Sequence, residues 1–137
     1  MITALVTKHS ISVDSLAESL KSNVAGAVAS FSGDVRDNDG DKSVISLTYE
    51  VHPSAQGVIE EITRRIAAKH DVLGVAVAHR YGEIALGETA FAVVVSAVHR
   101  GPAFAACEEI VSTVKDELPI WKYQVFADGT TEWVNSA

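Results

Sequence analysis

The stretch ISLTYEVHPSAQGVIEEITRRIAAK, residues 45–69, joins a strand pattern directly to a helix pattern. In its first part apolar side chains alternate with polar ones, which is the two-residue period of a half-buried strand, and the apolar set is Ile45, Leu47, Tyr49 and Val51. After Pro53-Ser54, apolar residues recur at helical spacing and leave a charged opposite face. A strand followed at once by an amphipathic helix predicts a sheet with helices packed on it.

The rest of the chain extends this pattern in both directions. Further strands are predicted at residues 2–7, 25–32, 73–79, 83–86 and 90–98. One more helix is N-capped by Asp14 or Ser15, and another begins at Pro102 and ends before Pro119. Asp128-Gly129 lies between two strand-like runs in residues 120–134 and predicts a hairpin. We therefore predict an α+β fold in a single domain, residues 1–137, with a mixed or mostly antiparallel sheet.

One polar stretch interrupts the apolar runs. Residues 34–43 read DVRDNDGDKS, and their Asp, Asn and Gly residues are typical of turns. The stretch is too short to separate two domains. We predict a loop here that is mobile when no ligand is bound.

The charge balance and the cysteine count narrow the class of protein. The 137 residues contain 11 Lys and Arg against 18 Asp and Glu, a formal net charge of −7, so a surface that coats nucleic acid is not expected. Cys107 is the only cysteine, which excludes an internal disulfide framework and fits a reducing compartment. No apolar run approaches the ~20 residues that cross a bilayer. We predict a cytoplasmic protein that does not bind membranes.

Cationic side chains lie at the ends of predicted elements, where functional groups are usually mounted. Arg36 starts the polar loop, whereas His99 and Arg100 lie between a buried strand and the N-terminus of a helix. Free backbone N–H groups and the positive end of the helix dipole favour a phosphate at such a place. The alternative is that Arg100 pairs with a surface carboxylate and that His99 is a satisfied core histidine.

Lys115 and Lys122 flank a turn that contains Pro119. If both amines meet in one partly buried pocket, their repulsion and desolvation lower the pKa of at least one of them. A neutral amine is then available for nucleophilic attack or proton transfer. The alternative is two solvated lysines.

Other reactive residue types are interpreted as structural. The histidines show no spacing that would chelate zinc, so no metal is expected. Cys107 lies on an apolar helix stripe and is expected to be inert packing. His79 continues a strand whose Val75 and Val77 face inward, and we expect it to be a hydrogen-bonded core residue.

Five segments, taken in order, resemble the large, catalytic subunit of molybdopterin synthase; they are FSGDVR (31–36), LTYE (47–50), HRYGEI (79–84), HR (99–100) and LPIWK (118–122). The resemblance spans nearly the whole chain, and the joint order and spacing are more specific than any one segment. It implies an α/β hammerhead fold with an added antiparallel hairpin region. This agrees with the α+β prediction.

The resemblance also implies an activity and its partners. Large subunits of this family form a homodimer, and each receives a small ubiquitin-like sulfur-carrier subunit whose C-terminal Gly-Gly tail is a thiocarboxylate. The tail gives sulfur to cyclic pyranopterin monophosphate, and two such transfers make the dithiolene of molybdopterin. No cofactor is implied for this step, and molybdenum belongs downstream.

By the same resemblance, Lys115 and Lys122 match the two active-site lysines of the family. Arg36, His99 and Arg100 match its basic anion-pocket positions, and the His-Arg pair acts across the dimer interface on the neighbouring pocket. The alternative function is a non-catalytic module that binds a phosphorylated small molecule or an acidic peptide tail with the same cations.

Overall fold

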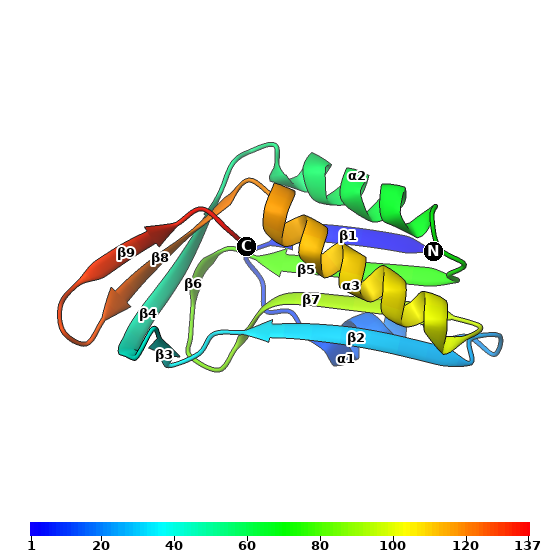
Figure 1. Ribbon diagram of the computed structural model, residues 1–137, viewed down its shortest axis with the longest axis horizontal. Coiled ribbons are helices and arrows are strands. Elements are labelled where there is room, and N and C mark those ends of the chain that lie inside the picture. Colours follow the sequence, from blue (N-terminus) through cyan, green and yellow to red (C-terminus); the bar gives the residue numbers. More distant parts are fainter.

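Two β-sheets and three helices make up the computed structural model, which describes residues 1–137 (Figure 1). The first sheet has the strand order β1 (Ile2–Thr7), β5 (Gly74–Arg80), β7 (Thr89–Ala97) and β2 (Ala27–Asp34). The β1–β5 pair is parallel and the other pairs are antiparallel. Helices α2 (Ala55–Ala67) and α3 (Arg100–Glu117) cover one face, and the short α1 (Val13–Ser19) covers the other.

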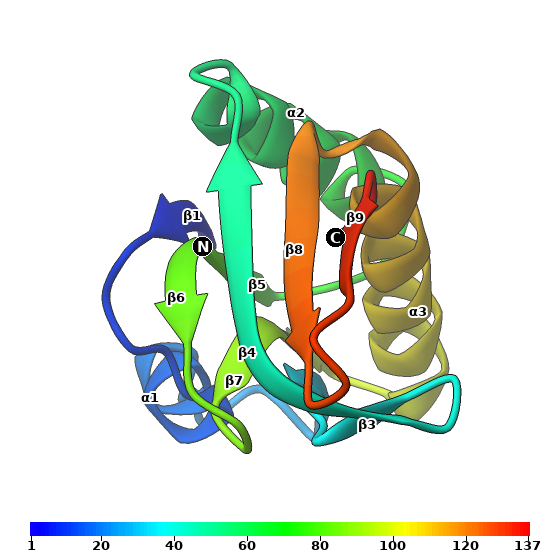
Figure 2. The same ribbon diagram turned by 90° about the vertical axis from the view of Figure 1, so that its left-hand side faces the viewer.

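The second sheet is antiparallel throughout and stands at one end of the first (Figure 2). Its strands follow the order β3 (Asn38–Asp39), β4 (Lys42–Val51), β8 (Ile120–Phe126) and β9 (Thr131–Val134). Strand β3 pairs with the start of β4, and β6 (Gly82–Ile84) pairs with residues 47–49 of β4. Strand β8 follows directly after α3, so the C-terminal end of that helix meets this sheet. The hairpin predicted at residues 120–134 is confirmed as β8 and β9. The mixed α+β prediction is also confirmed.

The main core lies between the first sheet and helices α2 and α3. Ile59, Ile62 and Ile66 of α2 are fully or almost fully buried, as the helical spacing predicts. Strands β5 and β7 are buried on both faces, because α1 packs on the side away from the long helices. No helix in this fold is long and apolar enough to cross a membrane.

The helix starts differ from prediction by a few residues. Helix α1 is capped by Ser12, whose hydroxyl accepts a hydrogen bond from the Ser15 amide at 3.0 Å, rather than by Asp14 or Ser15. Helix α3 begins at Arg100, so Pro102 is its third residue and not its first. Proline is tolerated there because the first four helix N–H groups have no acceptor within the helix. The predicted end of α3 before Pro119 is confirmed.

The polar stretch 34–43 is more regular than the predicted loop. Residues 38 and 39 pair with 43 and 42 across a two-residue turn in which Gly40 and Asp41 have φ of +56° and +65°. Positive φ at both positions is the type I′ geometry that suits a tight hairpin. The strand prediction also fails at Ile45, which is 59% exposed, because a register irregularity between Val44 and Ser46 turns Val44 inward instead.

Candidate active site

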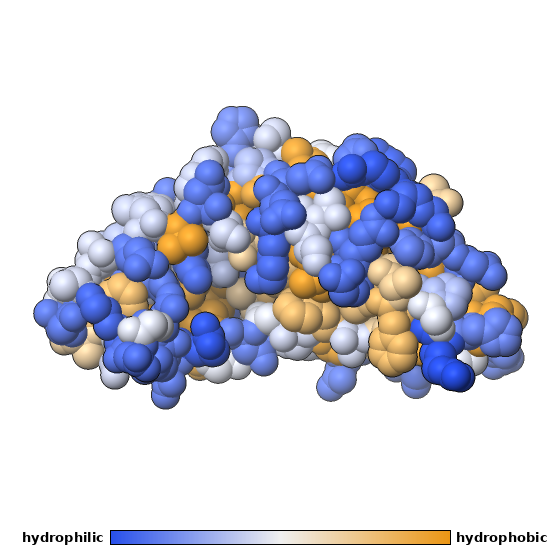
Figure 3. All heavy atoms as spheres, in the orientation of Figure 1, coloured by the Kyte–Doolittle hydropathy of each residue, from blue (hydrophilic) through white to orange (hydrophobic).

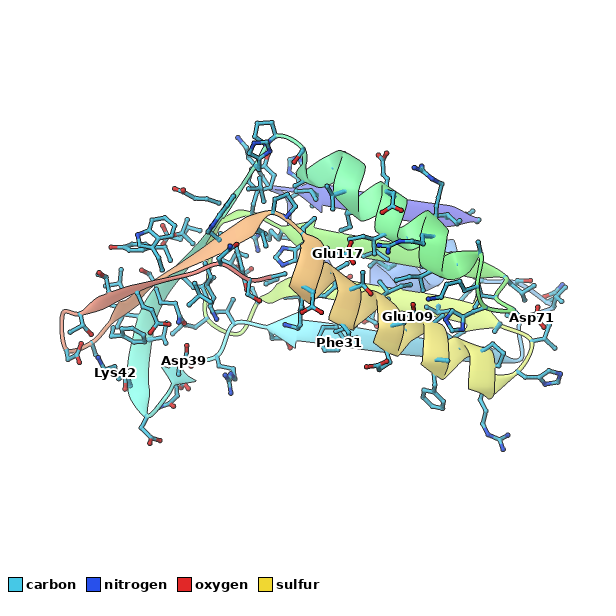
Figure 4. All side chains as sticks on the ribbon, turned by 45° about the horizontal axis from the view of Figure 1, so that its top comes forward. Phe31, Asp39, Lys42, Asp71, Glu109 and Glu117 are labelled. Atoms are coloured by element: carbon cyan, nitrogen blue, oxygen red, sulfur yellow. The ribbon has the colours of Figure 1, made fainter.

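A cavity of about 170 Å³ lies where the end of the first sheet, the second sheet and the last turn of α3 meet. Figure 4 places Glu117 at the C-terminal end of α3 and Asp39 on β3, and the cavity lies between these two elements. Its walls also include Gly33 and Phe91 from the first sheet and Tyr49 from β4. The site is therefore built at the junction of elements that are far apart in the sequence.

Three of the five predicted cations line this cavity. Lys115 comes from the last turn of α3, Lys122 from β8 and Arg36 from the segment between β2 and β3. Lys122 is the cross-strand partner of Tyr49, so their side chains emerge on the same face of the second sheet. The alternative of two unrelated, solvated lysines does not describe this arrangement, because both amines belong to one pocket.

The cations of the cavity are largely without protein partners. Arg36 and Lys122 form no side-chain hydrogen bond or ion pair within the chain, and Lys115 donates only to the backbone oxygen of Ala137, at 3.3 Å. Two carboxylates share the cavity, but neutral donors already occupy them. Asp34 accepts from the Ser32 and Thr89 hydroxyls at 2.6 and 2.9 Å, and Asp39 accepts from the Gln124 amide at 2.6 Å.

Two cations on the outer side of the helices are neutralised by carboxylates. The face of the molecule formed by α2 and α3 is mostly hydrophilic (Figure 3), and there Arg65 pairs with Glu61 and Glu117 while Lys69 pairs with Glu109. Arg64 and Arg100 on these helices form no ion pair, so the cavity is distinguished by the convergence of three such cations, whose charge is available to a ligand. An overall acidic chain thus keeps a local site suited to anions.

The environment of Lys115 also alters its acidity. Partial burial lowers the pKa of the Lys115 amine, and the positive charge of Lys122 lowers it further. A lowered pKa increases the fraction of neutral amine near neutral pH. Lys115 can therefore both attract an anion and exchange a proton with it.

His99 and Arg100 do not reach this cavity within one chain. They lie at the N-terminus of α3, and Lys115 follows Arg100 by fifteen residues, which is roughly 22 Å of helix. Both are exposed, and Arg100 forms no ion pair. The alternative of a core histidine beside a paired arginine is therefore wrong. The resemblance implies that this pair acts on the pocket of a neighbouring copy, and that role stays a prediction.

Several lining residues were not among the predicted site residues. Tyr49 is 8% exposed, and its hydroxyl forms no hydrogen bond within the chain. Burial raises the pKa of Tyr49 to about 12, so the phenol keeps its proton at neutral pH. Gln124 is a buried amide on β8 that anchors Asp39. A polar side chain at an inward-facing strand position is the signal that could have identified both.

The remaining reactive groups stay outside the site. Cys107 is buried in the core, and burial raises the pKa of its thiol to about 11, which agrees with its interpretation as inert packing. No three His, Cys, Asp or Glu side chains come together as a metal-binding group would require. His79 is fully buried beside two of the cavity aromatics, as expected for a core residue.

Known proteins with similar sequences and folds were then compared with the chain. A molybdopterin synthase catalytic subunit from Aspergillus niger is 37% identical over 129 residues, which is 93% of this chain and 72% of that protein. The solved structure of molybdopterin synthase from Staphylococcus aureus has a TM-score of 0.86 at 27% identity and covers 94% of both chains. A MoaE protein structure from Burkholderia ambifaria has a TM-score of 0.83 at 29% identity, with 99% and 90% covered.

A family model described as MoaE protein matches residues 6–117, from the last two residues of β1 to the end of α3. The match contains Arg36, His99, Arg100 and Lys115, and it stops just before Lys122. The chain belongs to the MoaE protein family.

Proposed function

We propose that this chain is the catalytic subunit of molybdopterin synthase. In this role it transfers sulfur from the C-terminal thiocarboxylate of a small carrier subunit to cyclic pyranopterin monophosphate. The observation that supports this most directly is the cavity, where three cations converge and none of them pairs with a side-chain carboxylate. Both reactants are anions, and only converging positive charge makes their approach favourable in a partly dry site. The names of the similar proteins agree with this activity.

In this proposal Lys115 contacts the terminal carbonyl of the carrier tail. The backbone oxygen of Ala137, the last residue of the chain, lies 3.3 Å from its amine, so an oxygen acceptor fits at this point of the cavity. The thiocarboxylate sulfur forms a carbon–sulfur bond to the substrate while a carbon–oxygen bond of the cyclic phosphate breaks, so the phosphate oxygen is the leaving group and the carrier stays joined as a thioester. Water then cleaves that thioester and frees the carrier as a carboxylate. The Lys115 ammonium stabilises the oxyanion that develops, and its neutral form accepts a proton.

Lys122 and Arg36 are assigned to the substrate phosphate. They line the same cavity as Lys115, from β8 and from the segment between β2 and β3, and neither is neutralised by a carboxylate of the chain. They offset negative charge as the cyclic phosphate opens. His99 and Arg100 bind the same substrate from a second copy of the chain, in a homodimer. No metal or other cofactor takes part in this assignment, and a cytoplasmic location stays a prediction.

The alternative is a module that binds a phosphorylated small molecule or an acidic tail without chemistry. It requires the same positive cavity but no proton transfer at Lys115. The lowered pKa of Lys115 favours the enzyme, because binding alone is served better by a fully charged amine.

The variant Lys115→Ala tests the proposal. We expect it to fold and to bind the carrier nearly as the wild type does, but to form no molybdopterin from cyclic pyranopterin monophosphate and thiocarboxylated carrier. Lys21→Ala, which removes an exposed lysine paired with Glu18, is the matched control and should retain full turnover. Normal turnover by Lys115→Ala would contradict the assignment and favour the binding module.

A further inference from the structure

His79 lies one layer beneath the candidate active site. On β5 it is flanked by Val6 of β1 and Phe91 of β7, and it is fully buried. Its ring stacks on Phe91 with centroids 5.2 Å apart and meets the Tyr49 ring edge-on at 4.9 Å. Both aromatic residues line the cavity, so His79 supports its floor.

The hydrogen bonding of His79 fixes its tautomer. Nδ1 lies 2.8 Å from the backbone oxygen of Arg80, which can only accept, so Nδ1 carries the ring proton. Burial lowers the pKa of His79 to about 4, so at neutral pH the other nitrogen, Nε2, is an unprotonated acceptor. This Nε2 is the one buried side-chain nitrogen or oxygen of the chain with no partner. Buried polar atoms are normally hydrogen-bonded, so packing alone does not explain an unpaired nitrogen at this position.

The charged and titratable groups around the ring leave few candidate donors; these groups are Tyr49, Arg80, Glu88, Lys115 and Lys122. Arg80 is already bonded to the Lys8 backbone oxygen and to Glu88, both at 3.3 Å. The positive charge of Lys122 acts on Lys115 and not on His79. Lys115 is the cation whose charge acts on His79, and its single hydrogen bond leaves N–H groups free.

We propose that His79 is a positioning residue for Lys115, whose amine donates a hydrogen bond to Nε2, directly or through one water, when it turns from the cavity mouth toward the floor. The bond stabilises the charged amine and holds it over the cavity between proton transfers. This inference rests on the proposed function only in the use made of Lys115. The contact itself is testable without turnover.

The test measures the pKa of Lys115 in the full chain, from the pH dependence of its acetylation rate followed by mass spectrometry. Lys8, on the surface, gives the internal reference. His79→Asn keeps a donor near the Nδ1 position but removes the Nε2 acceptor, whereas His79→Gln places an amide near the Nε2 position. We expect His79→Asn to lower the pKa of Lys115 by roughly half to one pH unit and His79→Gln to restore it. An unchanged pKa in a folded His79→Asn protein would overturn the proposal, and would point to Tyr49 as the donor.

A second measurement needs no change at His79. The nitrogen NMR signal of Nε2 in the wild type is compared with that in Lys115→Met and Lys122→Met. We expect the Nε2 signal to move toward that of a free lone pair in Lys115→Met and to stay in place in Lys122→Met. Equal signals in all three proteins would refute the contact. Because both readouts are independent of molybdopterin formation, their failure is distinguishable from failure of the proposed function.

Discussion

Acid should destabilise this protein through one residue in particular, His79. Its pKa is about 4 in the folded chain, against 6.5 for a free imidazole. As the pH falls, the unfolded chain therefore binds the proton first, and the folded chain is penalised. Its contribution to stability is full above pH 6.5 and is lost progressively as the pH falls to 4. The difference of about 2.5 pH units, at 1.36 kcal/mol each, corresponds to roughly 3 kcal/mol.

Urea unfolding at several pH values between 7 and 4 measures this loss. The wild type is compared with His79→Phe, which keeps a ring between Phe91 and Tyr49 but cannot bind a proton. Glu109 and Asp128, whose pKa values are also lowered, contribute equally to both proteins and cancel in the comparison. We expect the wild type to lose about 3 kcal/mol more than His79→Phe over this range. His9→Phe, at an exposed position, is the control. Equal losses in the wild type and His79→Phe would refute the reasoning.

Two further predictions concern the cavity walls. Lys122→Met should raise the pKa of Lys115 by about half to one pH unit, because the charge of Lys122 in the same cavity lowers that pKa and like charges repel appreciably at effective dielectric constants between water and ~20. A lysine side-chain NMR titration that shows no rise would contradict it. Gln124→Leu removes the donor to Asp39 and should accelerate amide hydrogen exchange in residues 38–43 about tenfold. Unchanged exchange there would show that the turn holds the hairpin without this bond.

Local patterns predict most of the fold because they act over short distances. The spacing of isoleucines identifies α2, Pro119 marks the end of α3, and Asp128-Gly129 marks the final hairpin. The irregularity at Val44–Ser46 has no such local signal, because it depends on pairing with residues of β8 some eighty positions later. For the same reason the sequence predicts a strand there but gives the wrong face for Ile45.

The candidate site shows the same difference between local patterns, which are predictable from the sequence, and long-range contacts, which are not. Lys115 and Lys122 are close in the sequence and flank one turn, so their meeting was predictable. The bond between Asp39 and Gln124 joins residues 85 positions apart, and only the assembled sheet brings them together. The unpaired nitrogen of His79 was not predictable either, since a histidine in an apolar strand normally finds partners for both nitrogens.

The length of α3 determines how many copies of the chain a complete site requires. The helix is continuous from Arg100 to Glu117, and its buried residues Ala106, Ile110 and Val114 pack on the sheet, so neither end can swing toward the other. Arg100 and Lys115 remain roughly 22 Å apart along the axis, and only Lys115 lines the cavity. One small anion cannot contact both in a single chain. If both act on one substrate, the arginine must come from a second copy, and catalysis then requires two paired chains.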